Sequence, residues 1–203
     1  GTLGLPIAPA QARGLIERAT PAPYGKGDRT LVDPAVRRCW QLPAESVRAT
    51  DPRWSAVLDT ITGAALAGLG VRGKAQAELY KLLVYDEGSF FLEHRDTEKS
   101  RGMFATLVVV LPSEHEGGEL VVRHQEREVT LDLSCADVGL VRFAAFYADC
   151  RHELRPVRSG YRVALVYNLV RTAGRPPSPP DHGATIDRVA AALSAWPDVP
   201  EAP

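Results

Sequence analysis

Two histidines and an aspartate have the residue types and the spacing of a metal site. His94 and Asp96 are two positions apart in an apolar segment, and in an extended strand such side chains point to the same face. His152 lies in a separate apolar segment far downstream, as expected if two strands converge on one ion. Two imidazoles and one carboxylate leave positions free on an octahedral ion, which suits a non-haem Fe(II) site.

A second inference concerns Arg162, ten positions after His152. The intervening residues 158–160 end in glycine and are typical of a loop between two strands. If this is a three-residue hairpin loop, Arg162 lies on the same face as His152, about 13 Å away by strand rise. An arginine there can bind one end of a short dicarboxylate whose other end meets the metal. A two-residue loop would place Arg162 on the opposite face.

Together these residues resemble the 2-oxoglutarate- and Fe(II)-dependent dioxygenases over roughly residues 76–170. Three features are most similar to the prolyl 4-hydroxylase-like branch: the spacing Tyr85…Gly88…His94-x-Asp96, the turn Gly117-Gly118-Glu119 and the strand Tyr161-Arg162-Val163. Two positions depart from the family. Arg162 stands where prolyl hydroxylases usually have lysine, and Ala164 stands where relatives that use arginine often have serine.

The resemblance implies a set of roles for these residues. His94, Asp96 and His152 would bind Fe(II), and Arg162 would pair with the distal carboxylate of 2-oxoglutarate. Tyr85 would donate a hydrogen bond to the same carboxylate, and Thr106 is a candidate for a second hydroxyl there, with core packing as its alternative. The implied reaction uses O₂, releases succinate and CO₂ and hydroxylates an unactivated C–H bond, with ascorbate as a further candidate cofactor.

The substrate class is less constrained than the chemistry. Family analogy favours a peptide or protein side chain, proline first, and the same scaffold would also suit a free amino acid or another small metabolite. A non-catalytic jelly-roll module that binds a metal or ligand is the alternative from a different class. The formal net charge of −1 is not the excess of positive charge typical of proteins that bind nucleic acid or a membrane surface. The oligomeric state is not determined by the sequence.

The cysteine content and the apolar runs favour a cytoplasmic protein. Three cysteines, Cys39, Cys135 and Cys150, do not make a complete disulfide framework and lack zinc-ligand spacing, which is typical of a reducing compartment. No apolar run approaches the roughly 20 residues of a membrane span.

The elements that must position these side chains are mostly strands. Seven or eight short strands separated by turn signals predict a β-sandwich or jelly roll, and the resemblance implies its double-stranded β-helix form. We therefore expect a mainly β fold with flanking helices (α+β). The predicted domain covers residues 1–170, with a core at 76–170 and a helical and strand extension at 1–75. Residues 171–203 are predicted to be a proline-rich linker and a short helix.

Several segments near the predicted site are interpreted as ordinary surface. Residues 21–30 are expected to be a connecting loop, with a lid over the substrate as the alternative. The pair Arg37-Arg38 is expected to be a solvated face, with an anion site as the alternative, and His115 and His124 are expected to face solvent. The loop 97–103 should overhang the metal as a solvated rim, with substrate contact as the alternative.

Overall fold

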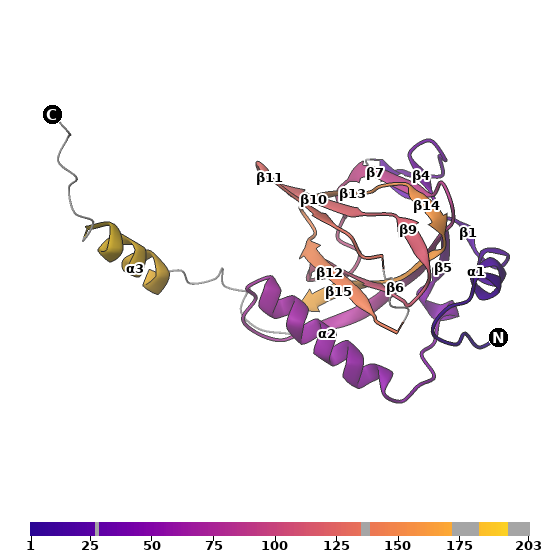
Figure 1. Cartoon of the computed structure of the whole chain (residues 1–203), viewed down its shortest axis with the longest axis horizontal. Coiled ribbons are helices and arrows are strands. Elements are labelled where there is room, and N and C mark those ends of the chain that lie inside the picture. Colours follow the sequence, from indigo (N-terminus) through magenta and orange to yellow (C-terminus); the bar gives the residue numbers. More distant parts are fainter. Residues whose placement is uncertain (27–28, 135–138, 172–182, 195–203) are drawn as a thin grey trace.

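Two antiparallel β-sheets face each other at the centre of the computed structural model (Figure 1). The structure describes residues 1–26, 29–134, 139–171 and 183–194. Its helices are α1 (Pro9–Ile16), the 3-10 turn η1 (Ala44–Ser46), α2 (Trp54–Gly68) and α3 (Gly183–Ser194). Its strands are β1 (Thr20–Pro21), β2 (Tyr24–Lys26), β3 (Arg29–Leu31), β4 (Arg37–Arg38), β5 (Trp40–Pro43), β6 (Ala75–Tyr85), β7 (Phe90–His94), β8 (Met103–Val110), β9 (His115–Gly117), β10 (Leu120–His124), β11 (Arg127–Leu131), β12 (Arg142–Tyr147), β13 (Arg151–Leu154), β14 (Val157–Gly160) and β15 (Arg162–Arg171).

The larger sheet, called here the major sheet, has the order β1-β5-β6-β15-β8-β12. The minor sheet has the order β11-β10-β13-β7-β4, and two further strand pairs, β14-β9 and β2-β3, lie outside both sheets. Neighbouring strands in the order come from distant parts of the sequence, as in a jelly roll. The structure therefore confirms the predicted mainly β fold with helices.

The two faces of strand β15 pack against two different apolar clusters. Because side chains alternate across a strand, Val163 and Leu165 pack into the apolar cluster shared with the helices. Ala164 belongs to the second cluster, which lies between the two sheets. Both clusters contain almost only aliphatic and aromatic side chains, so the polar residues on the inner face of β15 stand out as exceptions.

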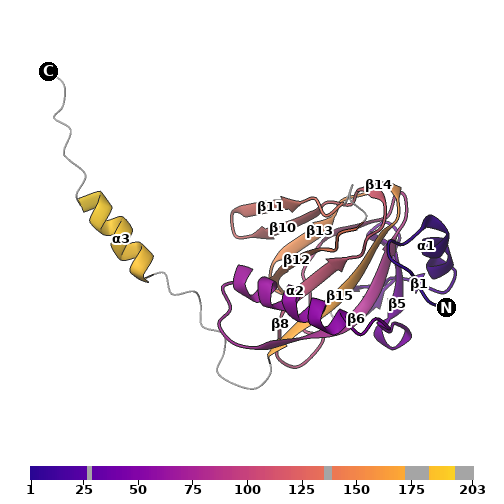
Figure 2. The ribbon, with the colours of Figure 1, turned by 60° about the horizontal axis from the view of Figure 1, so that its bottom comes forward.

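Helices α1 and α2 cover the outer face of the major sheet. In α2, Ile61 and Ala65 lie one turn apart on the buried face, in the same cluster as Leu82 and Val84 of β6. Figure 2 shows α2 lying across this face of the sheet. The helix stops before Gly70, whose φ of 68° is the left-handed conformation that glycine adopts readily.

The N-terminal residues complete both sheets rather than standing apart from them. Strand β5 pairs with β6 in the major sheet, and β4 pairs with β7 in the minor sheet. The segment 21–30 was predicted to be a connecting loop, but residues 24–26 and 29–30 within it belong to the antiparallel pair β2–β3. Such short strands are compatible with a stretch rich in Gly and Pro, since β2 and β3 have only three residues each.

The predicted hairpin between His152 and Arg162 is wrong. Residues 157–160 form β14, which pairs with β9 instead of turning back on β13. Strand β13, with His152, belongs to the minor sheet, and β15, with Arg162, belongs to the major sheet. Gly160 does have the left-handed conformation expected of it, with φ of 75°, but it turns the chain from the β14–β9 pair into the major sheet.

The predicted C-terminal helix is present as α3, whose described side chains, residues 187–194, are all exposed. The proline-rich stretch 172–182 lies outside the described residues. None of the helices in the described part of the chain has the length and apolarity that crossing a bilayer requires.

Candidate active site

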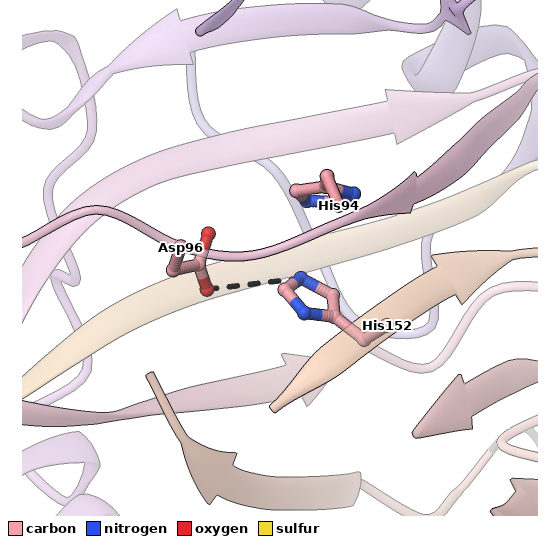
Figure 3. A group of neighbouring side chains, drawn as sticks. All are labelled: His94, Asp96 and His152. Atoms are coloured by element: carbon pink, nitrogen blue, oxygen red, sulfur yellow. Dashed lines mark ion pairs between the residues drawn. The ribbon is translucent and has the colours of Figure 1, made fainter. Parts of the chain in front are cut away.

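The three predicted metal ligands meet at the inner side of the minor sheet. His94 is the last residue of β7, and it is the register partner of His152 in the neighbouring strand β13. Asp96 follows two residues after His94 and reaches toward His152 from just beyond the end of the strand (Figure 3). One ligand atom from each of the three side chains lies within 4.8 Å of the others.

Both imidazole rings are held in the orientation that a metal ligand needs. The Nδ1–H of His94 donates to the carbonyl of Leu92 at 2.9 Å, and that of His152 donates to the carbonyl of Cys150 at 3.2 Å. A carbonyl oxygen can only accept, so each ring has its proton on Nδ1 and a free lone pair on Nε2. Such outer hydrogen bonds are the usual way in which proteins fix the tautomer of a metal-binding histidine.

The surroundings also keep the imidazoles neutral. Burial, with a further contribution from His152, lowers the pKa of His94 to about 3. Burial likewise lowers the pKa of His152 below its ordinary value. Because only the neutral imidazole has a lone pair for a metal ion, these pKa shifts favour cation binding at neutral pH.

Thr106, on strand β8 of the major sheet, forms a hydrogen bond with the third ligand. Its hydroxyl donates a hydrogen bond of 2.6 Å to Oδ2 of Asp96, the same oxygen that lies 3.7 Å from Nε2 of His152. Thr106 was a candidate for a hydroxyl near the distal carboxylate of 2-oxoglutarate, with core packing as the alternative, whereas in the structure its hydroxyl donates to the carboxylate of Asp96. The contact crosses from the major to the minor sheet and so ties the two sheets together at the site.

Arg162 lies across the cavity from the triad. It is only 2% exposed, and its Nε and Nη2 atoms have no hydrogen-bond partner among the described residues. Its guanidinium carbon lies 5.5 Å from the centre of the Tyr85 ring, and the two residues are register partners. Burial lowers the pKa of Arg162. A buried guanidinium with unused donors is costly unless a ligand supplies the acceptors.

The six residues singled out from the sequence all line one cavity between the sheets. The metal ligands come from the minor sheet and the residues just beyond it, and Tyr85, Thr106 and Arg162 come from the major sheet. Arg162 and His152 therefore line the same cavity, as predicted, although they are not connected by the predicted hairpin. Opposing sheets, rather than one hairpin, bring the two together.

Three polar residues were missed in the sequence. Arg37, expected in a solvated face, is 8% exposed, donates to the carbonyl of Pro23 and lies over the Phe91 ring. Lys81 is 8% exposed and also lines the cavity. His115, expected in solvent, is buried with its Nδ1 bonded to the carbonyl of Ser113, whereas His124 is exposed as predicted. A lysine inside the apolar run of β6 was the signal that could have identified Lys81.

The segments expected to be plain surface also reach this cavity. Tyr24 and Gly25 of β2 contribute to its wall, as do Thr97, Lys99 and Met103 from the loop after the proximal ligands. The loop 97–103 therefore does overhang the site, and three of its residues face into the cavity.

The donor set fits a divalent iron. Two neutral imidazoles and one carboxylate are the ligands of the non-haem Fe(II) facial triad, which leaves positions open for further ligands. Across the cavity, the unused donors of Arg162 fit a carboxylate, as 2-oxoglutarate would supply. Both halves of the expected cofactor pair thus have chemically matched residues.

Comparisons with known proteins agree with this geometry. Residues 80–170 match the family model described as "2OG-Fe(II) oxygenase superfamily". The comparison with curated protein sequences gives no match. Among solved structures, the chain resembles a 2OG-Fe(II) oxygenase family oxidoreductase from Burkholderia pseudomallei, with 20% identity, a TM-score of 0.51 and coverage of 81% of this chain and 79% of that one.

Two prolyl hydroxylases have a similar fold. A prolyl-4-hydroxylase from Pseudomonas putida is 19% identical, with a TM-score of 0.54 and coverage of 81% of this chain and 84% of that chain. A prolyl hydroxylase from Trichoplax adhaerens is 16% identical, with a TM-score of 0.52 and coverage of 79% and 76%. At these identities the likeness is one of fold.

The family model spans all six site residues, from Tyr85 in β6 to Arg162 in β15. The family name states its requirements, which are Fe(II), 2-oxoglutarate and molecular oxygen. The family-model match over residues 80–170, together with the His–Asp–His site, therefore supports a 2-oxoglutarate-dependent non-haem Fe(II) dioxygenase.

Proposed function

We propose that this domain hydroxylates an unactivated C–H bond of a peptide or protein side chain, with proline as the first candidate. In this proposal His94, Asp96 and His152 bind Fe(II), and Arg162 binds the distal carboxylate of 2-oxoglutarate with help from the Tyr85 hydroxyl. The observation that carries it is the buried guanidinium of Arg162, with unused donors, opposite a His–Asp–His cluster. A site for a metal alone has no need of that guanidinium.

Each residue then has a defined task. The Nδ1 hydrogen bonds of His94 and His152 aim their Nε2 atoms at the ion, and Thr106 holds the Asp96 carboxylate in place. Arg162 anchors the co-substrate at the far wall, so that its reactive end faces the triad. When bound, Fe(II) and 2-oxoglutarate supply the activation of O₂ that oxidises the substrate and yields succinate and CO₂.

Apolar side chains around the cavity exclude water from the reacting groups. Leu83, Val108 and Leu154 lie on its walls and are buried in the cluster between the sheets. A low-dielectric wall strengthens the pairing of Arg162 with a carboxylate. It also prevents activated oxygen from reacting with solvent instead of substrate.

The choice of a peptide substrate is supported by analogy alone. The Trichoplax adhaerens hydroxylase was solved with a peptide fragment of a hypoxia inducible factor, and its fold is similar to that of this chain. A free amino acid or small metabolite is the alternative substrate on the same cavity.

We further propose that residues 1–170 act as one domain, with the N-terminal extension as part of it. Pairing of β5 and β4 with the edges of the two sheets supports this division. A reducing compartment remains our proposal for its location, and the two described cysteines, Cys39 and Cys150, are free thiols.

The test is an anaerobic titration of metal-free protein with Fe(II) and then 2-oxoglutarate, followed by the charge-transfer absorption of the chelate. The parent should form the band, and His152→Ala should not. Arg162→Met, which keeps much of the side-chain bulk, should need at least about tenfold more 2-oxoglutarate, because one charge-assisted pair is lost. Arg155→Met removes the same charge from an exposed position and should titrate like the parent.

The outcomes separate the function classes. Succinate formation coupled to a substrate mass increase of one oxygen atom would support the hydroxylase. A folded parent that binds Fe(II) but whose spectrum does not respond to 2-oxoglutarate would contradict it and favour the non-catalytic binding module.

A further inference from the structure

The charges around the cavity are strongly one-sided. Five cationic side chains line it: Arg37, Lys81, Arg95, Lys99 and Arg162. Asp96 is the only carboxylate among the same lining residues, although the whole chain has 24 Lys and Arg against 25 Asp and Glu. None of the five cations forms an ion pair with a carboxylate in the described part of the chain.

The co-substrate and the metal do not balance this charge. Arg162 would be matched by the distal carboxylate of 2-oxoglutarate, and the Asp96 carboxylate would be used by the Fe(II) ion. Four cations then remain on the cavity wall, of which Arg37 and Lys81 are buried and Arg95 and Lys99 are exposed. A buried cation without an opposite charge is costly, so such a group in a cavity points to an anionic ligand.

Lys81 makes the strongest case. It lies in β6, where its register partner is Val166, four residues along β15 from Arg162, which places it about 13 Å from Arg162 along the sheet. Its ammonium donates to Oε1 of Gln41 at 2.8 Å and lies over the Tyr80 ring. Both of these partners are uncharged, and burial lowers the pKa of Lys81 to about 8.

Arg37, in β4 of the minor sheet, lies beside the metal ligands. Its guanidinium is over the face of the Phe91 ring at 4.2 Å, and Phe91 stacks on His94 with ring centres 3.5 Å apart. Its two hydrogen bonds go to the carbonyl of Pro23 and the sulfur of Cys39, neither of which is a carboxylate. Arg37 is thus a fixed, buried positive charge one ring away from the triad.

We propose that the substrate presents a carboxylate, which Lys81 and Arg37 bind while Arg162 holds 2-oxoglutarate. For the peptide substrate proposed above, on which this inference rests, the carboxylate is the side chain of an acidic residue next to the residue that is oxidised. Arg95 and Lys99 extend the same preference along the wall of the cavity. The enzyme would accordingly select acidic sequence contexts and disfavour basic ones.

The test uses three fluorescent peptides that differ only in the residues flanking a central proline, which are Glu, Gln or Lys. Binding is followed by anisotropy under anaerobic conditions, with Fe(II) and saturating 2-oxoglutarate present so that Arg162 is occupied. The Glu peptide should bind at least roughly tenfold more tightly than its Gln isostere, as expected for one charge-assisted pair, and the Lys peptide should bind most weakly.

Lys81→Met should remove most of the difference between the Glu and Gln peptides, because it removes the charge and keeps the length of the side chain. Lys81→Gln is a second variant with the same expected result. Arg72→Gln, which removes one charge from an exposed residue outside the cavity, should keep the preference. Equal binding of the Glu and Gln peptides by the parent, or a preference that survives in both Lys81 variants, would overturn the proposal.

Binding without turnover keeps this inference separable from the proposed function. If the chelate band fails to form, the dioxygenase assignment fails whatever the peptides do. If no peptide binds, free glutamate and O-phosphoserine are added in a thermal-shift assay. A stabilisation that depends on Lys81 would support the anion site and assign it to a small-molecule substrate, and its absence would overturn the anion site.

Discussion

At the scale of single residues, the site is marked by polar groups whose surroundings do not satisfy them. Arg162 is almost fully buried with two unused donors, and Lys81 is a buried ammonium without a carboxylate partner. Each of these arrangements costs stability in the ligand-free protein. Each is explained by a bound anion, and the cost is therefore expected to disappear when the residue is replaced by an apolar one.

Lys81→Met should stabilise the ligand-free protein by about 1–3 kcal/mol at pH 7, because it replaces a buried unpaired charge with an apolar side chain of similar length. Chemical denaturation of the metal-free parent and variant measures the change in the free energy of unfolding. A destabilised variant would mean that the ammonium is satisfied in the folded protein.

The parent and Lys81→Met should also differ in how the free energy of unfolding depends on pH. The pKa of Lys81 falls from 10.5 to about 8 on folding, mainly because the ammonium is buried and lies near the charge of Arg37. The charge of Lys99 lowers this pKa further, and the carboxylate of Asp96 raises it. Between these two pH values the unfolded chain holds a proton that the folded chain has released, so the free energy of unfolding rises with pH. The advantage of Lys81→Met over the parent should therefore shrink from pH 8 to 10.5, and a constant difference would contradict this.

Substitutions of Thr106 test whether its hydrogen bond positions the carboxylate of Asp96 for metal binding. Thr106→Val keeps the shape and removes the hydroxyl that donates to Asp96, so the affinity for Fe(II) should fall by about 10–100-fold. Thr106→Ser retains a hydroxyl and should recover most of the affinity. Anaerobic metal titration compares the three proteins; equal affinities would show that this hydrogen bond has no role in metal binding.

At the scale of elements, the turn between β14 and β15 determines where Arg162 lies. The chain leaves the β14–β9 pair at Gly160 and enters the centre of the major sheet within two residues. Gly160 has φ of 75°, and a Cβ there would clash with the carbonyl oxygen of Glu114. Neither the conformation nor the space suits any residue with a side chain.

Gly160→Ala should destabilise the protein by at least about 2 kcal/mol, since it adds a backbone clash to a strained left-handed conformation. The matched control is Gly63→Ala in α2, where a Cβ would have no neighbour within 4 Å. That substitution should stabilise the protein by about 0.5–1 kcal/mol, because alanine is the better helix former. Denaturant midpoints measure both; similar effects at the two positions would contradict the role of the turn.

At the scale of the whole molecule, the site exists only because two sheets face each other. The metal ligands belong to the minor sheet and its end, the co-substrate residues to the major sheet, and the N-terminal strands extend both. Strands from β2 to β15 thus contribute to one cavity, whereas the described side chains of α3 are exposed.

A chain ending at Arg171 should accordingly keep its thermal midpoint and its chelate band. Removing α3 takes away no described buried side chain, so the free energy of unfolding should change by less than about 0.5 kcal/mol. A chain shortened at the other end, starting at Ala44, loses β4 and β5 and should not fold to the same stability. Differential scanning calorimetry of both is the measurement. A large loss on removing residues 172–203 would show that this segment contributes to the domain.

Local rules explain why much of the site was accessible from sequence. Side chains two apart in a strand share a face whatever the fold, so His94 and Asp96 were paired by spacing alone, and the alternation of apolar residues predicted the strands. Long-range packing is different, because it depends on which strands meet. The sheet that carries Arg162, the burial of Arg37 and His115, and the contact of Thr106 with Asp96 were decided only in the tertiary structure. Burial is a property of the assembled sheets, and so is the unbalanced charge around Lys81.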